Sequence, residues 1–220
     1  MPHSTFRLIT ILALVALAIA CALVGGPANS VDVALIRDGI AARMASPLPT
    51  EAGLFLNYAG GVAATLGIGT VAALLLWFRG RVRRAVLFAA VVLGGRLLIE
   101  AIKLIVHRAR PALDPHPVLT HSLSFPSVHA GNSMIAFLAL ALFFAPAARR
   151  GGFVLLAVLA SLVIGSSRSL IGVHWPSDVL AGWSIGAAWI LATWPIASRL
   201  TSDKAEHDVV GGHRPVLGEE

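Results

Sequence analysis

Long apolar stretches separated by short polar segments organise the chain. A helix that crosses a bilayer needs about 20 mainly apolar residues. Six stretches meet or approach that length: Leu8–Val24, Gly53–Phe78, Ala85–Val106, Val128–Ala147, Gly152–Leu170 and Val179–Ala197. Strands of a membrane barrel would alternate apolar with polar residues, whereas these stretches are continuously apolar and rich in Ala and Leu. The pattern therefore predicts an all-α protein, an integral-membrane bundle of six helices.

Composition supports a membrane protein with a single domain. Of the 220 residues, 57% are hydrophobic and 13% are charged, whereas a soluble domain carries about 25% charged residues. We expect residues 1–200 to form the membrane domain and the polar residues 201–220 to form a disordered cytoplasmic tail. The run from Val31 to Met44 predicts a short interfacial helix outside the bundle. A cleaved signal peptide is the alternative interpretation of the first apolar stretch; we favour a retained helix because the run is long.

The positive charges predict the orientation. The net charge is +6, and basic residues follow the second, fourth and sixth apolar stretches and precede the first: Arg79, Arg81, Arg83, Arg84, Arg149, Arg150, Arg199, Lys204 and Arg7. Basic residues mark cytoplasmic loops, and with six spans all of these lie on one side. We therefore expect a multi-pass membrane protein with both termini in the cytoplasm. Without a nucleic-acid-binding fold or aromatic stripe, the charge does not indicate a nucleic-acid partner.

Polar residues at the ends of the apolar stretches form the candidate site. They are Lys103, Arg110, Ser127, His129, Arg168, His174 and Asp178. In the predicted topology all of them lie at the external, or periplasmic, ends of their helices. Each residue alone is compatible with a helix cap or a contact to lipid headgroups. Together they supply cations, imidazoles, a carboxylate and a hydroxyl, which suit the binding and cleavage of a phosphate ester.

The spacing of two of these residues suggests nucleophilic catalysis. His174 and Asp178 are four residues apart, which places them on one helix face. A carboxylate that accepts a proton from one imidazole nitrogen leaves the other nitrogen free to attack. We expect His174 to form a phosphohistidine, Asp178 to orient it, and His129 to act as general acid and then general base.

The remaining residues are predicted to bind the substrate. Lys103, Arg110 and Arg168 would hold the phosphate oxygens, and the Ser127 hydroxyl would donate to the same group at a helix start. No carboxylate cluster suited to Mg²⁺ is seen in the sequence, so we expect no metal and no cofactor. Arg96 and Glu100, four apart within one apolar stretch, predict a structural ion pair.

Three motifs in this region resemble the signature of the type-2 phosphatidic acid phosphatase superfamily, which includes vanadium haloperoxidases. Lys103, six residues and Arg110-Pro111 match KxxxxxxRP; Ser167-Arg168, five residues, His174, three residues and Asp178 match SRxxxxxHxxxD. The family's PSGH stands here as Pro126–His129, with Val128 in place of glycine. The resemblance implies a helical core and the residue roles given above. Because Val128 removes no reacting group, we expect an active enzyme.

The resemblance implies a lipid phosphatase whose substrate comes from the outer leaflet of the membrane. Undecaprenyl pyrophosphate is the favoured substrate, and phosphatidylglycerophosphate or phosphatidic acid is the alternative. A non-catalytic protein that binds or transports lipids is a third hypothesis, which predicts a degraded site. Haloperoxidases in the superfamily are soluble and larger, so that activity is not expected.

Overall fold

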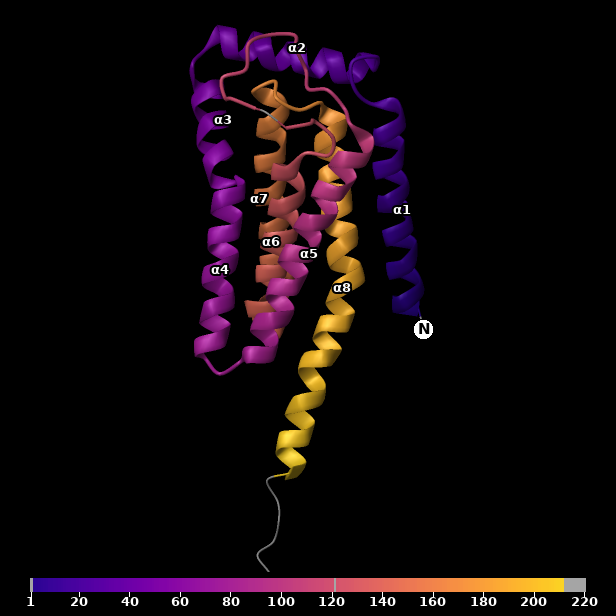
Figure 1. The fold of residues 1–220 in the computed structure, drawn as a ribbon, viewed down its shortest axis with the longest axis vertical. Coiled ribbons are helices and arrows are strands. Elements are labelled where there is room, and N and C mark those ends of the chain that lie inside the picture. The colour runs from indigo at the N-terminus through magenta and orange to yellow at the C-terminus, as the bar shows by residue number, and fades with distance from the viewer. Residues whose placement is uncertain (1, 121, 212–220) are drawn as a thin grey trace, which may run out of the picture.

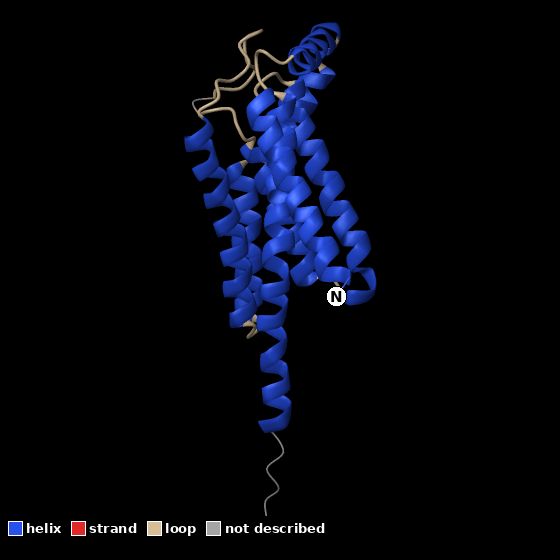
Figure 2. Cartoon of the chain, turned by 90° about the vertical axis from the view of Figure 1, so that its right-hand side faces the viewer, coloured by secondary structure: helices blue, strands red, loops and turns tan. Residues whose placement is uncertain are grey.

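The protein is built from helices that run along one common direction, with one helix lying across their ends (Figure 1). The computed structural model describes residues 2–120 and 122–211. Its helices are α1 (Pro2–Val24), α2 (Ser30–Ala45), α3 (Leu48–Ala59), α4 (Val62–Phe78), α5 (Val82–Val106), α6 (Val128–Phe144), the short 3₁₀ helix η1 (Ala147–Arg149), α7 (Arg150–Leu170) and α8 (Pro176–Gly211). Within those ranges there is no strand (Figure 2), which confirms the all-α prediction.

Five helical segments are long and apolar enough to cross a membrane. They are Ser4–Val24, Leu48–Phe78, Val82–Val106, Ala147–Leu170 and Pro176–Thr201. The apolar helix α6 is shorter, with 17 residues. The sequence predicts this segment to continue to Ala147, but the helix ends at Phe144. Pro146 explains the difference, because the residue before a proline is disfavoured in the helical conformation.

A break divides the second predicted span into α3 and α4. Gly60 and Gly61 lie between the two helices, and Gly61 has an extended backbone with φ −67° and ψ 167°. Glycine lowers helix stability because its backbone has more freedom to lose. A side chain at Gly60 would also overlap Ile164 of α7. The glycine pair therefore bends the span and lets it approach α7 closely.

Helix α6 lies inside the bundle and contacts α4, α5, α7 and α8. Most of its residues are buried. Around it, Phe88 of α5 packs edge-on against Phe143, whose ring also meets Trp194 of α8. A Cβ at Gly95 would overlap Ile135 and Trp189, so a small residue lets these helices pack closely.

A helix is present where the short interfacial helix is predicted: α2 crosses the end of the bundle (Figure 1). The side chain of Asn29 begins it by accepting from the backbone N–H groups of Val31 and Asp32. Arg43, near its end, pairs with Asp114 at 3.1 Å. This ion pair ties α2 to the long loop between α5 and α6, so both elements cover the same end of the molecule.

The start of α1 and the far part of α8 lie at the opposite end of the bundle from α2 (Figure 1). Helix α8 continues to Gly211, so residues 201–211 of the stretch predicted as a disordered tail are helical. The remainder of that predicted tail, residues 212–220, lies outside the described residues. Within α5, Arg96 and Glu100 form the predicted ion pair with an N···O distance of 3.5 Å.

Candidate active site

The predicted site residues lie at the end of the bundle that α2 crosses. Lys103 belongs to the last turn of α5, and Ser127 and His129 lie at the start of α6. Arg168 is in the last turn of α7, and Asp178 is in the first turn of α8. Hydrogen bonds join these segments directly, including one from the backbone N–H of Ser127 to the carbonyl of Asp178 at 3.0 Å.

A tight turn between α7 and α8 presents His174. The carbonyl of Arg168 accepts hydrogen bonds from the backbone N–H groups of Val173 and His174, at 3.1 and 3.3 Å. The turn needs Gly172, whose φ of +76° is costly for a residue with a side chain. His174 is therefore fixed by backbone contacts, and it is only 1% exposed.

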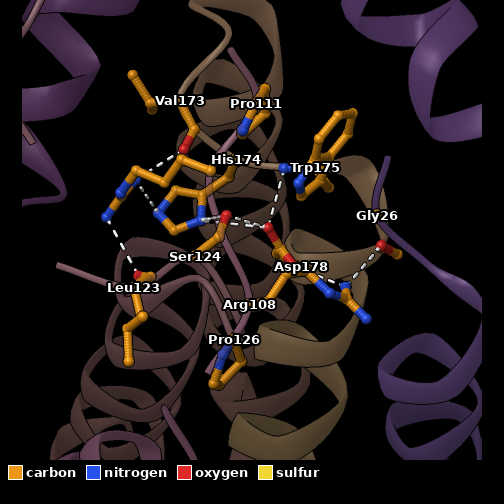
Figure 3. A network of polar contacts seen from close by, with 12 residues as sticks. Gly26, Arg108, Pro111, Leu123, Ser124, Pro126, Val173, His174, Trp175 and Asp178 are labelled. Atoms are coloured by element: carbon orange, nitrogen blue, oxygen red, sulfur yellow. Dashed lines mark hydrogen bonds and ion pairs between the residues drawn. The ribbon is translucent and has the colours of Figure 1, made fainter. Parts of the chain in front are cut away.

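Ser124 stands between His174 and Asp178 (Figure 3). Its hydroxyl lies 2.5 Å from Oδ2 of Asp178 and 3.4 Å from Nδ1 of His174. The direct distance from Nδ1 to Oδ2 is 3.6 Å, longer than a hydrogen bond. The two residues lie close together as predicted, but not on one helix face, because α8 begins at Pro176 and His174 lies in the turn before it. A serine links the imidazole to the carboxylate.

Arg110 determines which imidazole nitrogen carries the lone pair. Its guanidinium NH1 lies 3.1 Å from Nε2 of His174 and 2.7 Å from the carbonyl of Val173. A guanidinium only donates hydrogen bonds, so Nε2 must accept and the proton of the neutral ring belongs on Nδ1. The nitrogen with the free electron pair therefore faces a cation that suits phosphate.

The surroundings of His174 keep it uncharged. Burial, followed by the positive charges of Arg110, Arg168 and Lys103, holds the pKa of the His174 imidazole well below its ordinary value of 6.5. A neutral imidazole retains the electron pair that a nucleophile needs. The same cations that would hold a phosphate therefore also keep the nucleophile in its reactive form.

Asp178 is completely buried at the start of α8. Its Oδ2 accepts from the backbone N–H of Trp175 at 3.0 Å, and its Oδ1 pairs with Arg108 at 2.8 Å. Pro176, which has no N–H to satisfy, occupies the first position of the helix. A carboxylate at this position gains from the positive end of the helix dipole, and the hydrogen bonds from Trp175 and Arg108 hold both of its oxygens in place.

Lys103 is 3% exposed and binds the loop that carries the next motif. Its ammonium donates to the carbonyls of Leu123 and Pro126, at 2.7 and 3.2 Å. Arg110 also contacts the Leu123 carbonyl, at 3.4 Å. Two of the three ammonium donors are thus used within the protein, and one is available to a ligand.

Asn57 of α3 joins the remaining two polar residues. Its side-chain oxygen accepts from Arg168 at 2.6 Å, and its carbonyl lies 3.3 Å from Nε2 of His129. The Nε atom of Arg168 is buried without a hydrogen-bond partner in the structure. Arg168 and His129 are therefore held by one residue of α3, at the turn just before the glycine break.

Ser127 precedes α6 with its side chain fully buried. Its hydroxyl has no hydrogen-bond partner in the structure, which leaves it able to donate to a bound anion. Val128 is the first residue of the helix and does not have a positive φ. The backbone there does not require glycine, and the valine side chain packs into the apolar core.

The model of the PAP2 superfamily matches residues 84–202, which is more than half of the chain. The chain belongs to the PAP2 superfamily. The match contains all seven predicted site residues, from Lys103 to Asp178, together with α6, α7 and most of α5 and α8. The family resemblance inferred from the three motifs is thereby confirmed.

Relatives within the PAP2 superfamily include lipid phosphatases. The chain is 34% identical to a lipid A 1-phosphatase of Rhizobium johnstonii over 142 residues, 53% of this chain and 55% of the relative. It is 36% identical to phosphatidylglycerophosphatase B of Bacillus subtilis over 99 residues, 41% of this chain and 47% of the relative. The chain spans about half the length of the curated relatives that it matches.

A solved PAP2 structure has the same fold. The transmembrane PAP2-type phosphatidylglycerolphosphate phosphatase of Bacillus subtilis superposes with a TM-score of 0.77, covering 88% of this chain and 96% of that chain. The sequence identity is 23%, so the likeness concerns the helical arrangement. It supports a multi-pass membrane protein with the helix order described above.

Three residues of this PAP2 site were not identified from the sequence: Ser124, Arg108 and Asn57. Ser124 and Arg108 lie within or beside the recognised motifs. Their polarity in so apolar a chain could have marked them as candidates for the site. Asn57 lies far away along the chain, in the segment before the glycine pair. Nothing in the sequence placed α3 against α7, so that residue gave no signal.

Proposed function

We propose that the protein is an integral-membrane lipid phosphatase that works through a phosphohistidine intermediate. One observation carries the proposal: His174 is buried and neutral, with its Nε2 electron pair beside Arg110 and its Nδ1 side facing Ser124 and Asp178. This arrangement makes Nε2 nucleophilic where a phosphate would be bound. A residue with a purely structural role would not need cations around its free electron pair.

In the first step, Nε2 of His174 attacks phosphorus while the bond from phosphorus to the leaving oxygen breaks. His129 donates a proton to that oxygen, so the lipid departs as an alcohol or as the shorter phosphate. The Nδ1 proton remains with the ring, and Asp178 stabilises the positive charge through Ser124. The product is phosphoryl-His174.

In the second step, water attacks the phosphorus of the phosphohistidine. His129 takes a proton from that water, the bond between phosphorus and Nε2 breaks, and inorganic phosphate leaves. Phosphoryl transfer spreads negative charge over the equatorial oxygens. Lys103, Arg110 and Arg168 would stabilise that charge, and the Ser127 hydroxyl would donate to the same group.

Undecaprenyl pyrophosphate is the substrate that we propose first, in agreement with the expectation from the sequence motifs. Hydrolysis of its terminal phosphate would regenerate the carrier lipid of bacterial cell-wall synthesis. The second candidate is lipid A 1-phosphate, favoured by the match to a lipid A 1-phosphatase over 142 residues. Phosphatidylglycerophosphate is a further candidate, because the chain is similar to phosphatidylglycerophosphatase B.

The proposed orientation has the site at the external face of the bacterial cytoplasmic membrane and both termini inside. We take α6 as the sixth span, joining the five longer segments. Its 17 residues give a length of about 25 Å, somewhat less than a hydrocarbon core of about 30 Å. Neighbouring helices surround α6, so its ends are shielded by protein. A lipid phosphate in the outer leaflet would then lie at the level of His174.

The experiment is phosphate release from a panel of undecaprenyl pyrophosphate, lipid A 1-phosphate, phosphatidylglycerophosphate and phosphatidic acid in detergent with EDTA. Wild type and His174→Ala are compared, with His107→Asn as the control because His107 is exposed and asparagine tolerates its positive φ. We expect release by wild type and the control, and none above background by His174→Ala.

The panel separates the candidate functions. The substrate with the highest kcat/KM identifies the lipid. Loss of activity with EDTA, restored by Mg²⁺, would contradict the proposed metal independence. No release from any lipid by folded wild type would favour the non-catalytic lipid-binding hypothesis.

A further inference from the structure

The Arg108 side chain lies on the far side of Asp178 from His174 (Figure 3). Its side chain is 8% exposed. Its NH1 donates to Oδ1 of Asp178 at 2.8 Å and to the hydroxyl of Ser177 at 3.1 Å. The loop after α5 thus reaches the start of α8 through one guanidinium.

Arg108 controls both oxygens of the Asp178 carboxylate. It binds Oδ1 directly through its guanidinium. Its own carbonyl accepts from the backbone N–H of Ser124 at 2.8 Å, and the hydroxyl of Ser124 donates to Oδ2. One residue therefore fixes the carboxylate from one side and the serine that links it to His174 from the other.

The first helix holds the other edge of the guanidinium. The NH2 group of Arg108 donates to the carbonyls of Cys21 and Ala22, both at 2.8 Å. These carbonyls belong to the end of α1, where the last four carbonyls of a helix lack partners within it and carry its negative dipole end. The guanidinium also lies over the ring of Phe125, 4.7 Å from its centroid. Its position is therefore fixed on every side.

A second contact at the start of α8 does not involve the carboxylate of Asp178. Asp32 of α2 accepts from the backbone N–H and the hydroxyl of Ser177, at 2.9 and 2.5 Å, and from the N–H of Gly26 at 2.6 Å. It anchors the α1–α2 connection to α8 as Arg108 does. Asp32 thus provides a matched comparison, an anchor that does not touch Asp178.

We propose that Arg108 is a positioning residue that orients Asp178 and balances its charge, so that the end of α1 is a working part of the active site. The inference rests on the proposed role of His174 and Asp178. A guanidinium stays charged at all accessible pH values, so Arg108 offsets the carboxylate permanently. The carboxylate then orients His174 without drawing a second proton onto its ring.

Removal of the Arg108 charge changes the protonation of His174 in a defined direction. The charged or titratable groups that act on the imidazole are Lys103, Arg110, His129, Arg168 and Asp178. Without Arg108, the negative charge of Asp178 acts on the imidazole uncompensated. A nearby opposite charge favours the protonated ring, so the pKa of His174 should rise.

The test compares Arg108→Gln with Asp32→Asn in phosphate-release assays from about pH 4 to pH 8, the range in which histidine titrates. We expect Arg108→Gln to lower kcat about a hundredfold, the scale of a misplaced catalytic group, and to move the acidic limb of kcat/KM to higher pH. Asp32→Asn is expected to lower the melting temperature and leave that limb in place. If the acidic limb of kcat/KM lies at the same pH in both variants, Arg108 is only a structural anchor and the proposal is overturned.

Two further measurements complete the test. The His174 pKa is read by NMR from isotope-labelled histidine, with His174→Ala to assign the signal, so it does not depend on turnover. An inactive wild type contradicts the proposed function, whereas an unmoved His174 pKa in Arg108→Gln contradicts the inference about Arg108. If Arg108→Gln does not fold, Arg108→Lys replaces it. Lysine keeps the positive charge but lacks the planar guanidinium that donates several hydrogen bonds at once. We therefore expect Arg108→Lys to have the acidic limb of wild type and a lower kcat. A wild-type kcat in this variant would overturn the positioning role.

Discussion

The hydroxyl of Ser124 lies 2.5 Å from the carboxylate of Asp178 and 3.4 Å from the imidazole of His174. Because the hydroxyl has one proton and gives it to the carboxylate, its lone pair is left to accept the Nδ1 proton of His174. The link between nucleophile and carboxylate therefore passes through a serine.

Ser124→Ala is expected to lower kcat by roughly tenfold to a hundredfold, because a hydrogen bond to a charged group contributes about 1.5–3 kcal/mol. KM should change little, since the hydroxyl faces Asp178 and not the substrate. Steady-state kinetics measure both constants. Ser184→Ala is the control, a buried serine on α8 that binds the carbonyl of Leu180. An unchanged kcat in Ser124→Ala would show that the direct contact between His174 and Asp178 suffices.

The low pKa of His174 predicts how activity depends on pH. Nucleophilic attack needs the neutral ring, so the acidic limb of kcat/KM due to His174 should lie well below pH 6.5. Arg110→Gln removes the nearest of the cations that depress this pKa, so its limb should move toward higher pH. A limb in Arg110→Gln that stays at the wild-type position would mean that the Arg110 charge does not lower the His174 pKa.

The same pKa makes His174 a source of acid sensitivity. The unfolded chain has an ordinary histidine pKa near 6.5, above the value in the folded protein. Below pH 6.5 the unfolded state therefore binds more protons, and the contribution of His174 to stability is lost as the pH falls toward the folded value. Thermal melts at decreasing pH should show a smaller loss for His174→Gln than for wild type. Identical losses would assign the acid sensitivity to other groups.

Val128→Gly is expected to retain phosphatase activity, because Val128 contributes no reacting group and its backbone is helical. The variant should melt at a lower temperature, since glycine costs about 1 kcal/mol in a helix and the valine packs into the core. Phosphate release and a thermal melt, run on the same preparation, measure the two effects. Loss of activity with the melting temperature preserved would show that valine shapes the phosphate pocket.

Gly165→Ala is expected to destabilise the protein by about 1–3 kcal/mol, the usual cost of overpacking. A Cβ at this position of α7 would overlap the indole of Trp183 on α8. Gly67→Ala is the matched control, because nothing lies within 4 Å of its added Cβ, and alanine there should stabilise helix α4 by up to about 1 kcal/mol. Activity should fall together with stability in Gly165→Ala, whereas Gly67→Ala should keep both. Equal melting temperatures for both variants would contradict the close α7–α8 contact.

The sequence predicts the helices well because a long apolar segment in a membrane must satisfy its backbone hydrogen bonds internally, as a helix does. It also predicts that His174 lies near Asp178, since the two residues are only four apart, although His174 lies in the turn before α8 and not on the helix. It does not predict the break at Gly60 and Gly61, because glycine is tolerated in membrane helices and tertiary packing against Ile164 decides the outcome.

The contacts made by Asn57 and Arg108 could not be predicted for a different reason. Each depends on which helices become neighbours, and one sequence carries no direct signal for that. The motifs name residues that could react, whereas the residues that hold them in place come from other helices. Asn57 at the end of α3 and the carbonyls at the end of α1 both belong to this second group.

The contacts around Arg108 also have a consequence for biosynthesis. They join residues 21 and 22 at the end of α1 to residues 177 and 178 at the start of α8. A nascent chain cannot form them until α8 has entered the membrane and met α1. The proposed catalytic centre is therefore assembled only once α8 has inserted, and a chain truncated before α8 would reach the membrane without it.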